Sequence, residues 1–140
     1  MRFERRVSSE HFDALARVFG DVNPLHIDAA AARAAGFDRP IGQGAVLVCF
    51  LSEIIGRQLG IATPIFCGLE ISFEQPFYED DWLSIELESR HHSAALGGTS
   101  YGFAVAREGE RIAHGEFLVK EPRSARRMPP PGYEPEPSAT

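Results

Sequence analysis

Apolar and polar residues alternate through most of the C-terminal half of the chain. Apolar side chains recur at every second position in four stretches: Leu69–Phe73, Trp82–Ser89, Tyr101–Val105 and Ile112–Lys120. A period of two predicts β-strands that bury one face. The pairs Gly97-Gly98 and Glu108-Gly109 favour tight turns between the later strands. The pattern therefore predicts an antiparallel sheet in this half.

The N-terminal half begins with a predicted strand at Arg2–Val7 and a helix directly after it. Ser8 or Ser9 can cap the start of this helix, and Gly20 ends it. Apolar residues at helical spacing form one face of the helix: Phe12, Leu15, Ala16 and Phe19. This end of the chain therefore adds one amphipathic helix to the sheet.

The next segment combines two predicted loops with a short helix. Asp21–Asp28 and Phe37–Gly44 are predicted loops, because polar residues, Gly and Pro dominate them. The alanine-rich stretch Ala29–Ala35 between them predicts a short helix that ends at Gly36.

The stretch Ala45–Leu59 has a different pattern. Its first seven residues are all apolar, and polar character returns only at Ser52 and Glu53. A helix that is apolar all round is a buried helix. Cys49, within this run, is accordingly expected in the core.

One long buried helix followed by antiparallel strands predicts an α+β fold. An antiparallel sheet can curl around a helix on one face and leave the other face in water. Such a sheet has exposed edge strands, which proteins must protect from unwanted pairing. We therefore expect a homodimer whose two sheets join edge to edge.

Composition indicates how many domains the chain forms and which kinds of partner it can bind. The 140 residues, 44% hydrophobic and 24% charged, are typical of a single globular domain, expected at 1–121. Residues 122–140 are rich in Pro and predict a disordered tail. The net charge of −6 argues against nucleic acid as a partner.

The N-terminal sequence and the two cysteines indicate a protein of a reducing compartment. The charged N-terminus predicts no signal peptide, and the longest apolar run, Ala45–Leu51, is too short to span a membrane. Cys49 and Cys67 form no CxxC pair, so a structural disulfide is not expected. We predict a soluble cytoplasmic protein without membrane association.

Candidate chemistry concentrates in the loop Asp21–Asp28. Asp21 and His26 lie five residues apart around Pro24, so a carboxylate and an imidazole can approach one water from two sides. An imidazole exchanges protons near neutral pH, which suits general acid–base catalysis. Asn23 can bond to the loop backbone. The alternative interpretation is ordinary turn chemistry around a proline.

A second candidate is Gly44, at the expected start of the buried helix. The first N–H groups of a helix lack acceptors and carry the positive end of its dipole, so they can stabilise an oxyanion. Ser52 in the helix can support the site, or simply bond its own backbone. No motif with the spacing of metal ligands occurs, and His91-His92 is expected in an exposed turn.

These residues resemble the MaoC-like hydratases, which include the (R)-specific enoyl-CoA hydratases and adopt the hotdog fold. The family motif, Asp-x-Asn-Pro-[Leu/Ile]-His-x-Asp, matches at every fixed position: Asp21, Asn23, Pro24, Leu25, His26 and Asp28. Residues Arg39–Gly44, leading into an apolar helix, extend the resemblance, which covers about Val7 to Glu121.

The resemblance implies an (R)-specific enoyl-thioester hydratase or 3-hydroxyacyl-thioester dehydratase in fatty acid metabolism. Asp21 and His26 would hold the water that adds to C3, and Gly44 would donate its N–H to the thioester carbonyl. Asn23 would shape the loop, and Ser52 would support the site. No metal or redox cofactor is expected, because the thioester itself makes C2 acidic and the enzyme only moves protons and water. Coenzyme A or an acyl-carrier phosphopantetheine is part of the substrate. A dimer is expected, and a higher oligomer is an alternative.

One departure and two rival functions accompany this interpretation. Gln43 stands where the family usually has His. A glutamine side chain can form hydrogen bonds but cannot accept and release a proton. A hotdog acyl-CoA thioesterase would use the same N–H but direct water at the carbonyl carbon. A non-catalytic acyl-thioester-binding subunit would need neither Asp21 nor His26.

Overall fold

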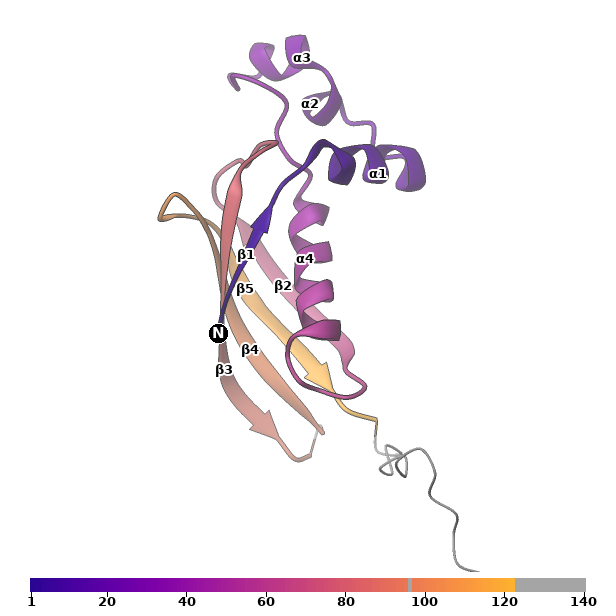
Figure 1. Cartoon of the computed structure of the whole chain (residues 1–140), viewed down its shortest axis with the longest axis vertical. Helices are drawn as coiled ribbons and strands as arrows, with labels where there is room; N and C mark the ends of the chain where they lie inside the picture. The colour runs from indigo at the N-terminus through magenta and orange to yellow at the C-terminus, as the bar shows by residue number, and fades with distance from the viewer. Residues whose placement is uncertain (96, 123–140) are drawn as a thin grey trace, which may run out of the picture.

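A five-stranded antiparallel sheet curls around helix α4 in the computed structural model, which describes residues 1–95 and 97–122 (Figure 1). The elements follow in this order: β1 (Arg2–Arg6), α1 (Ser9–Phe19), α2 (Pro24–Ile27), α3 (Ala29–Ala34), α4 (Gly44–Arg57), β2 (Ile65–Phe73), β3 (Trp82–Ser93), β4 (Gly98–Arg107) and β5 (Glu110–Lys120). The predicted α+β class is confirmed. The predicted tail, except for Pro122, lies outside the described residues.

The strands are ordered β1-β3-β4-β5-β2, and every neighbouring pair is antiparallel. The central register pairs Leu87 with Phe103 and Tyr101 with Phe117. Partners across a sheet point to the same face, so the apolar positions of successive strands form one continuous inner surface. The predicted alternation is therefore correct, and β1 and β2 form the two edges.

Helix α4 packs on this inner surface. Its buried side chains are Val46, Leu47, Phe50, Leu51, Ile54 and Ile55. They join residues of the sheet, such as Leu83, Ile85, Val105 and Phe117, in one hydrophobic core. Burial of each large side chain contributes roughly 1.5–3 kcal/mol.

The prediction that α4 is buried all round is wrong for the single chain. Ala45, Cys49 and Ser52 are exposed, and Cys49 is therefore not a core residue. The reason is geometric, since one sheet covers one side of a helix. The opposite side of α4 stays open in the described structure.

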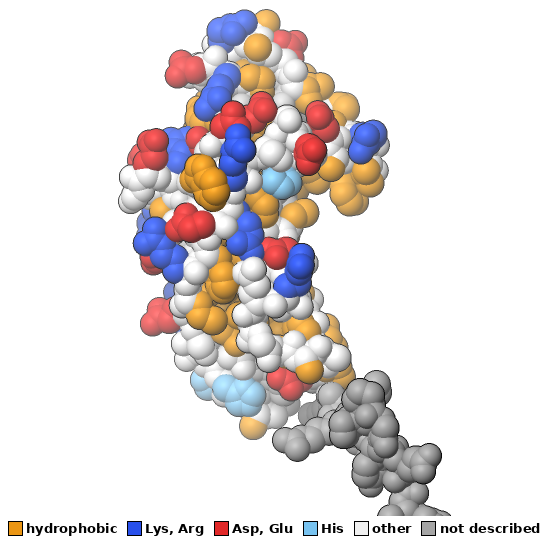
Figure 2. Space-filling view, in the orientation of Figure 1, with side chains coloured by type: hydrophobic (Ala, Val, Ile, Leu, Met, Phe, Trp, Pro, Cys, Tyr) orange, Lys and Arg blue, Asp and Glu red, His pale blue; other side chains and the backbone are white. Residues whose placement is uncertain are grey.

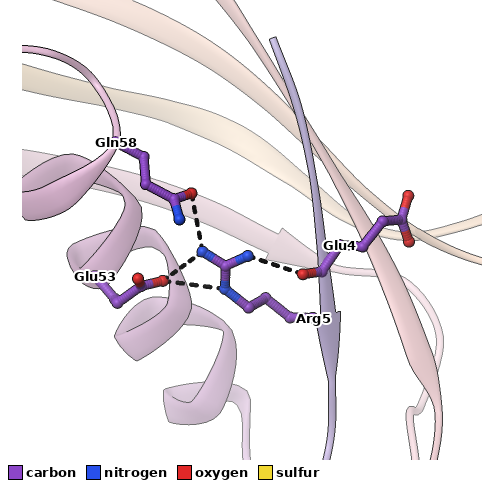
Figure 3. Close-up of polar contacts among 4 residues, drawn as sticks. All are labelled: Glu4, Arg5, Glu53 and Gln58. Carbon is purple, nitrogen blue, oxygen red and sulfur yellow. Dashed lines mark hydrogen bonds and ion pairs between the residues drawn. The ribbon is translucent and has the colours of Figure 1, made fainter.

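An ion-pair network fastens β1 to α4 (Figure 3). Arg5 donates through Nε and an Nη atom to Glu53 Oε2, at 3.0 and 2.6 Å, and through the same Nη atom to Gln58 Oε1 at 3.0 Å. Its other Nη atom donates to the Glu4 carbonyl oxygen at 2.8 Å. The network ties the edge strand β1 to the C-terminal half of α4.

Helix α1 follows the predicted boundaries, with Ser8 as N-cap and Gly20 as C-cap at φ 71°. Phe12 and Leu15 are buried as expected, but Phe19 is 76% exposed. Phe19 joins exposed Val18 and Val22 in an apolar patch at the end of α1 (Figure 2). The last turn of α1 therefore extends beyond the core that buries Phe12 and Leu15.

Two further predictions need correction. Pro24–Ile27, predicted as loop, forms the single-turn helix α2, which is too short for a periodic signal. His91 and His92, predicted in a turn, belong to β3, which extends to Ser93. His92 Nδ1 lies 2.9 Å from Thr99 Oγ1 on β4, a pairing that depends on residues distant in the sequence.

The expected hairpin turn at Glu108-Gly109 is confirmed, since both residues have positive φ, at 52° and 84°. Among the described helices, none is both long and apolar enough to cross a membrane.

Candidate active site

The segment from Gly20 to Gly44 lies at one end of the sheet, beside the start of α4 (Figure 1). The Asp21 N–H donates to the Leu15 carbonyl at 3.3 Å, so the chain turns sharply after α1. Asn23 then caps α2, with Oδ1 accepting from the Leu25 N–H at 3.1 Å. Proline at the first helical position suits this short turn. The predicted role of Asn23 in shaping the segment fits these contacts.

His26 occupies a defined orientation at this end. Its Nδ1 lies 2.8 Å from the Ile41 carbonyl oxygen. A carbonyl only accepts hydrogen bonds, so this contact assigns the proton of the neutral ring to Nδ1. Nε2 is then left as an acceptor, the state that a general base requires.

A pocket of about 450 Å³ opens beside His26. Residues from three segments line it: His26, Phe37, Ile41, Gly42, Gly44, Phe73, Glu74, Gln75, Pro76 and Phe77. The structure therefore brings together His26 and Gly44, two of the predicted site residues. An apolar cleft with a few polar groups is the usual form of a small-molecule site.

Gly44 is the first residue of α4, as expected. Its N–H has no acceptor inside the helix and lies at the positive end of the helix dipole. The Phe73 ring packs against its Cα, and a Cβ built at Gly44 would lie 2.6 Å from Phe73 Cζ. Only glycine fits this position without displacing a ring that lines the pocket.

Gly42 has a similar role two residues earlier. Its N–H donates to the Phe77 carbonyl at 2.7 Å, and a Cβ there would lie 2.0 Å from Phe77 Cε2. The close approach fastens the segment before α4 to the segment after β2. Both walls of the pocket are thereby held together.

Gln43, between these glycines, is the N-cap residue of α4 and is 1% exposed. Neither Nε2 nor Oε1 of its side chain has a hydrogen-bond partner among the described residues. A buried amide normally has a partner, so this side chain is an unusual feature of the site. It is not among the residues that line the pocket.

Three other residues that the sequence singled out are not among those that line the pocket. Asp21 is half-buried between α1 and α2, and Ser52 is exposed two turns along α4. Asp28 caps α3, with Oδ1 accepting from the N–H groups of Ala30 and Ala31 at 2.7 and 3.2 Å. The last carboxylate of the motif therefore has a structural role in this chain.

Glu74 is a pocket residue that sequence reasoning missed. Arg111 donates to both of its carboxylate oxygens, at 2.8 and 2.9 Å, and His114 Nδ1 lies 3.0 Å from Oε1. The hydrogen bonds from Arg111 hold the pKa of Glu74 below its ordinary value, and burial offsets this effect in part. No local motif marks Glu74, because its partners on β5 are distant in sequence.

The aromatic lining, Phe37, Phe73 and Phe77, was missed for a similar reason, since each belongs to a different local pattern. Within residues 1–95 and 97–122, no group of three or more His, Cys, Asp or Glu side chains is arranged to hold a metal ion.

Comparison with protein families gives a match over residues 2–96 to the family described as "MaoC like domain". The chain is 34% identical over 87 residues to the (R)-specific enoyl-CoA hydratase of Aeromonas caviae, covering 62% of this chain and 65% of that protein. It is 33% identical over 81 residues to the mitochondrial 3-hydroxyacyl-[acyl-carrier-protein] dehydratase of Arabidopsis thaliana, covering 58% and 48%. The alignments thus span under two thirds of the first relative and about half of the second.

Solved structures share the same fold. The (R)-hydratase from A. caviae involved in PHA biosynthesis superposes with a TM-score of 0.79 at 29% identity, covering 87% of this chain and 93% of that one. The unliganded R-hydratase PhaJ1 from Pseudomonas aeruginosa gives a TM-score of 0.77 at 25% identity, covering 87% and 79%. The hotdog fold implied by the sequence motif is therefore confirmed.

Proposed function

The chain belongs to the MaoC-like domain family, and on this premise we propose that it is an (R)-specific enoyl-thioester hydratase, or a dehydratase in the reverse direction. The observation that carries the proposal is the contact of His26 Nδ1 with the Ile41 carbonyl, 2.8 Å long. It leaves Nε2 of His26 as an acceptor in a pocket that Gly44 also lines. The hydratase and dehydratase names of the relatives support the same reaction class.

In the proposed reaction, water adds across the C2=C3 bond of a trans-2-enoyl thioester. His26 Nε2 removes a proton from the water as its oxygen bonds to C3. Negative charge moves to the thioester oxygen, which accepts a hydrogen bond from the Gly44 N–H. The proton taken up by His26 then passes to C2 on the same face, directly or through Asp21, which completes the 3-hydroxyacyl thioester and restores neutral His26.

Asp21 is the second acid–base group in this proposal. It is not among the residues that line the pocket, but it lies half-buried five residues before His26, and we assign to it the orientation of the water or the transfer of the proton to C2. Asn23, Gln43 and Ser52 support the site in our proposal, Asn23 through its cap on α2. Coenzyme A or an acyl-carrier phosphopantetheine enters as part of the substrate, and the reaction needs no resident metal or redox cofactor. We retain the cytoplasm as the proposed location and residues 1–121 as the proposed domain.

The test uses crotonyl-CoA and follows the absorbance of its C2=C3 bond conjugated to the thioester carbonyl. We expect the wild-type protein to remove this absorbance without releasing free thiol. His26→Ala and Asp21→Asn should each lower kcat by roughly 10²–10⁴, the usual range for a positioned acid or base. Circular dichroism checks that both variants are folded.

Matched controls are His92→Ala, an exposed imidazole on β3, and Asp13→Asn, an exposed carboxylate on α1. Both should keep wild-type turnover. Release of thiol would favour the thioesterase, and unchanged turnover in folded His26→Ala would refute the proposed role of His26. Binding of acyl-CoA without turnover would favour the non-catalytic subunit.

A further inference from the structure

Arg39 differs from most described arginines in having no acidic partner. Six arginines form ion pairs with carboxylates: Arg2, Arg5, Arg6, Arg90, Arg107 and Arg111. Arg39 forms none with any described residue, although Asp38 precedes it in the chain. Its charge is therefore not neutralised in a protein whose net charge is −6.

The Arg39 guanidinium is nevertheless held in place. Its Cζ lies 5.0 Å from the centre of the Tyr78 ring. The Cζ of Arg107 lies 5.5 Å from the same centre, and Arg107 itself donates to Asp81 Oδ2 at 3.3 Å and the Pro76 carbonyl at 3.1 Å. A cation–π contact orients a guanidinium without cancelling its charge. We call Arg39, Tyr78 and Arg107 the arginine–tyrosine shelf.

Arg39 and Tyr78 of the shelf are next to the His26 pocket in the chain, although neither is among the residues that line it. Arg39 is two residues before Ile41, and Tyr78 directly follows Phe77, so each is close to a residue that lines the pocket. Two residues span at most about 7 Å of chain. The bond from the Gly42 N–H to the Phe77 carbonyl holds these two segments together next to the shelf.

We propose, resting on the proposed function, that Arg39 binds the 4′-phosphate of the pantetheine arm that carries the acyl group. The thioester reacts between His26 and Gly44, so the arm must leave the pocket across its rim. The 4′-phosphate is the phosphate closest to the thioester, and coenzyme A and acyl-carrier proteins share it. A guanidinium pairs with phosphate through parallel hydrogen bonds, and stacking on Tyr78 prepares Arg39 for this contact.

The experiment compares three thioesters: crotonyl-CoA, crotonyl-4′-phosphopantetheine and crotonyl-pantetheine. Arg39→Gln should raise KM about ten-fold for the two phosphorylated substrates, the usual effect of losing one charge-assisted hydrogen bond. KM for crotonyl-pantetheine and kcat for all three should stay within about two-fold. The matched control is Arg17→Gln, an exposed arginine on α1 away from the pocket.

Variants of Tyr78 test whether its ring orients the Arg39 guanidinium, because they leave the charge of Arg39 in place. Tyr78→Phe keeps the ring and should leave every KM unchanged. Tyr78→Leu removes the ring and should reproduce part of the Arg39→Gln effect, again only for the phosphorylated substrates. Equal effects of Tyr78→Phe and Tyr78→Leu would contradict the role of the shelf.

Two results would overturn the assignment. An equal increase in KM for all three thioesters would mean that Arg39 only maintains the pocket. An increase for crotonyl-CoA alone would mean that Arg39 contacts a phosphate on the adenosine side. If the wild-type protein hydrates none of the thioesters, the proposed function has failed. Calorimetry with coenzyme A, 4′-phosphopantetheine and pantetheine then decides whether binding depends on the 4′-phosphate and on Arg39.

Discussion

Gly44 combines two features: it has no room for a side chain, and its N–H is the proposed donor to the thioester oxygen. The Phe73 ring occupies the volume of a Cβ, and this ring is 54% exposed, so it can move. A substitution should therefore displace the ring into the pocket without unfolding the protein. Function and stability should respond differently at this position.

We expect Gly44→Ala to lower kcat/KM for crotonyl-CoA by about 10- to 100-fold, because small displacements in a site have effects of this size. Its Tm should stay within a few degrees of the wild-type value. The control is Gly56→Ala on the same helix, where a Cβ meets nothing within 4 Å. That change should stabilise the protein by about 0.5–1 kcal/mol and preserve turnover. Full activity of Gly44→Ala would contradict the expected displacement of the Phe73 ring, since alanine keeps the N–H.

At the level of elements, the Glu74–Arg111 pair connects the residue after β2 to β5 at the edge of the pocket. Folding lowers the pKa of Glu74 through the hydrogen bonds from Arg111. The folded state therefore favours the carboxylate. Its contribution to stability is complete above the ordinary Glu pKa of about 4.3 and is lost as pH falls through the lowered pKa.

We expect Glu74→Gln to lower Tm near pH 7 by at most about 5 °C, since the pair is partly exposed and screened by solvent. The difference from wild type should shrink as pH falls from 5 towards 3. Thermal unfolding, monitored by circular dichroism at each pH, measures this difference in Tm. Glu88→Gln, a change at an exposed position without a described ion pair, serves as control. A difference in Tm between Glu74→Gln and the wild-type protein that grows at low pH would contradict the direction of the pKa shift.

Helices and strands could be predicted from the sequence where a periodic pattern of apolar residues continues over several turns or residue pairs. The alternation was sufficient to place β2 to β5, although each strand is longer than predicted, and the caps at Ser8 and Gly20 placed both ends of α1. The turn α2 was missed because four residues cannot display a period. His91 and His92 were misplaced because their strand depends on pairing with β4.

At the level of the whole molecule, three surfaces have no partner among the described residues. β1 and β2 are edge strands, and α4 has an exposed side that includes Ala45, Cys49 and Ser52. An unprotected edge can pair with another strand. We propose that a second copy of the chain continues the sheet at β2.

Light scattering should then report about twice the chain mass of 15.4 kDa at micromolar concentration. If the site depends on the dimer, specific activity should fall when the protein is diluted below its dimer dissociation constant. An equally aged, undiluted sample controls for inactivation. A monomer at micromolar concentration with full activity would contradict both statements.

The sequence alone determined the fold class, the motif Asp21–Asp28 and the helix start at Gly44, because each depends on residues close together in the chain. It also identified His26 and Gly44, which the structure places around one pocket. Only the tertiary structure decided which tautomer His26 adopts, since Ile41 accepts its proton across fifteen residues. It likewise revealed Glu74 between Arg111 and His114, and the arginine–tyrosine shelf. It also showed that the buried amide of Gln43 has no hydrogen-bond partner among the described residues. These features depend on contacts between distant segments, and such contacts leave no periodic trace in the sequence.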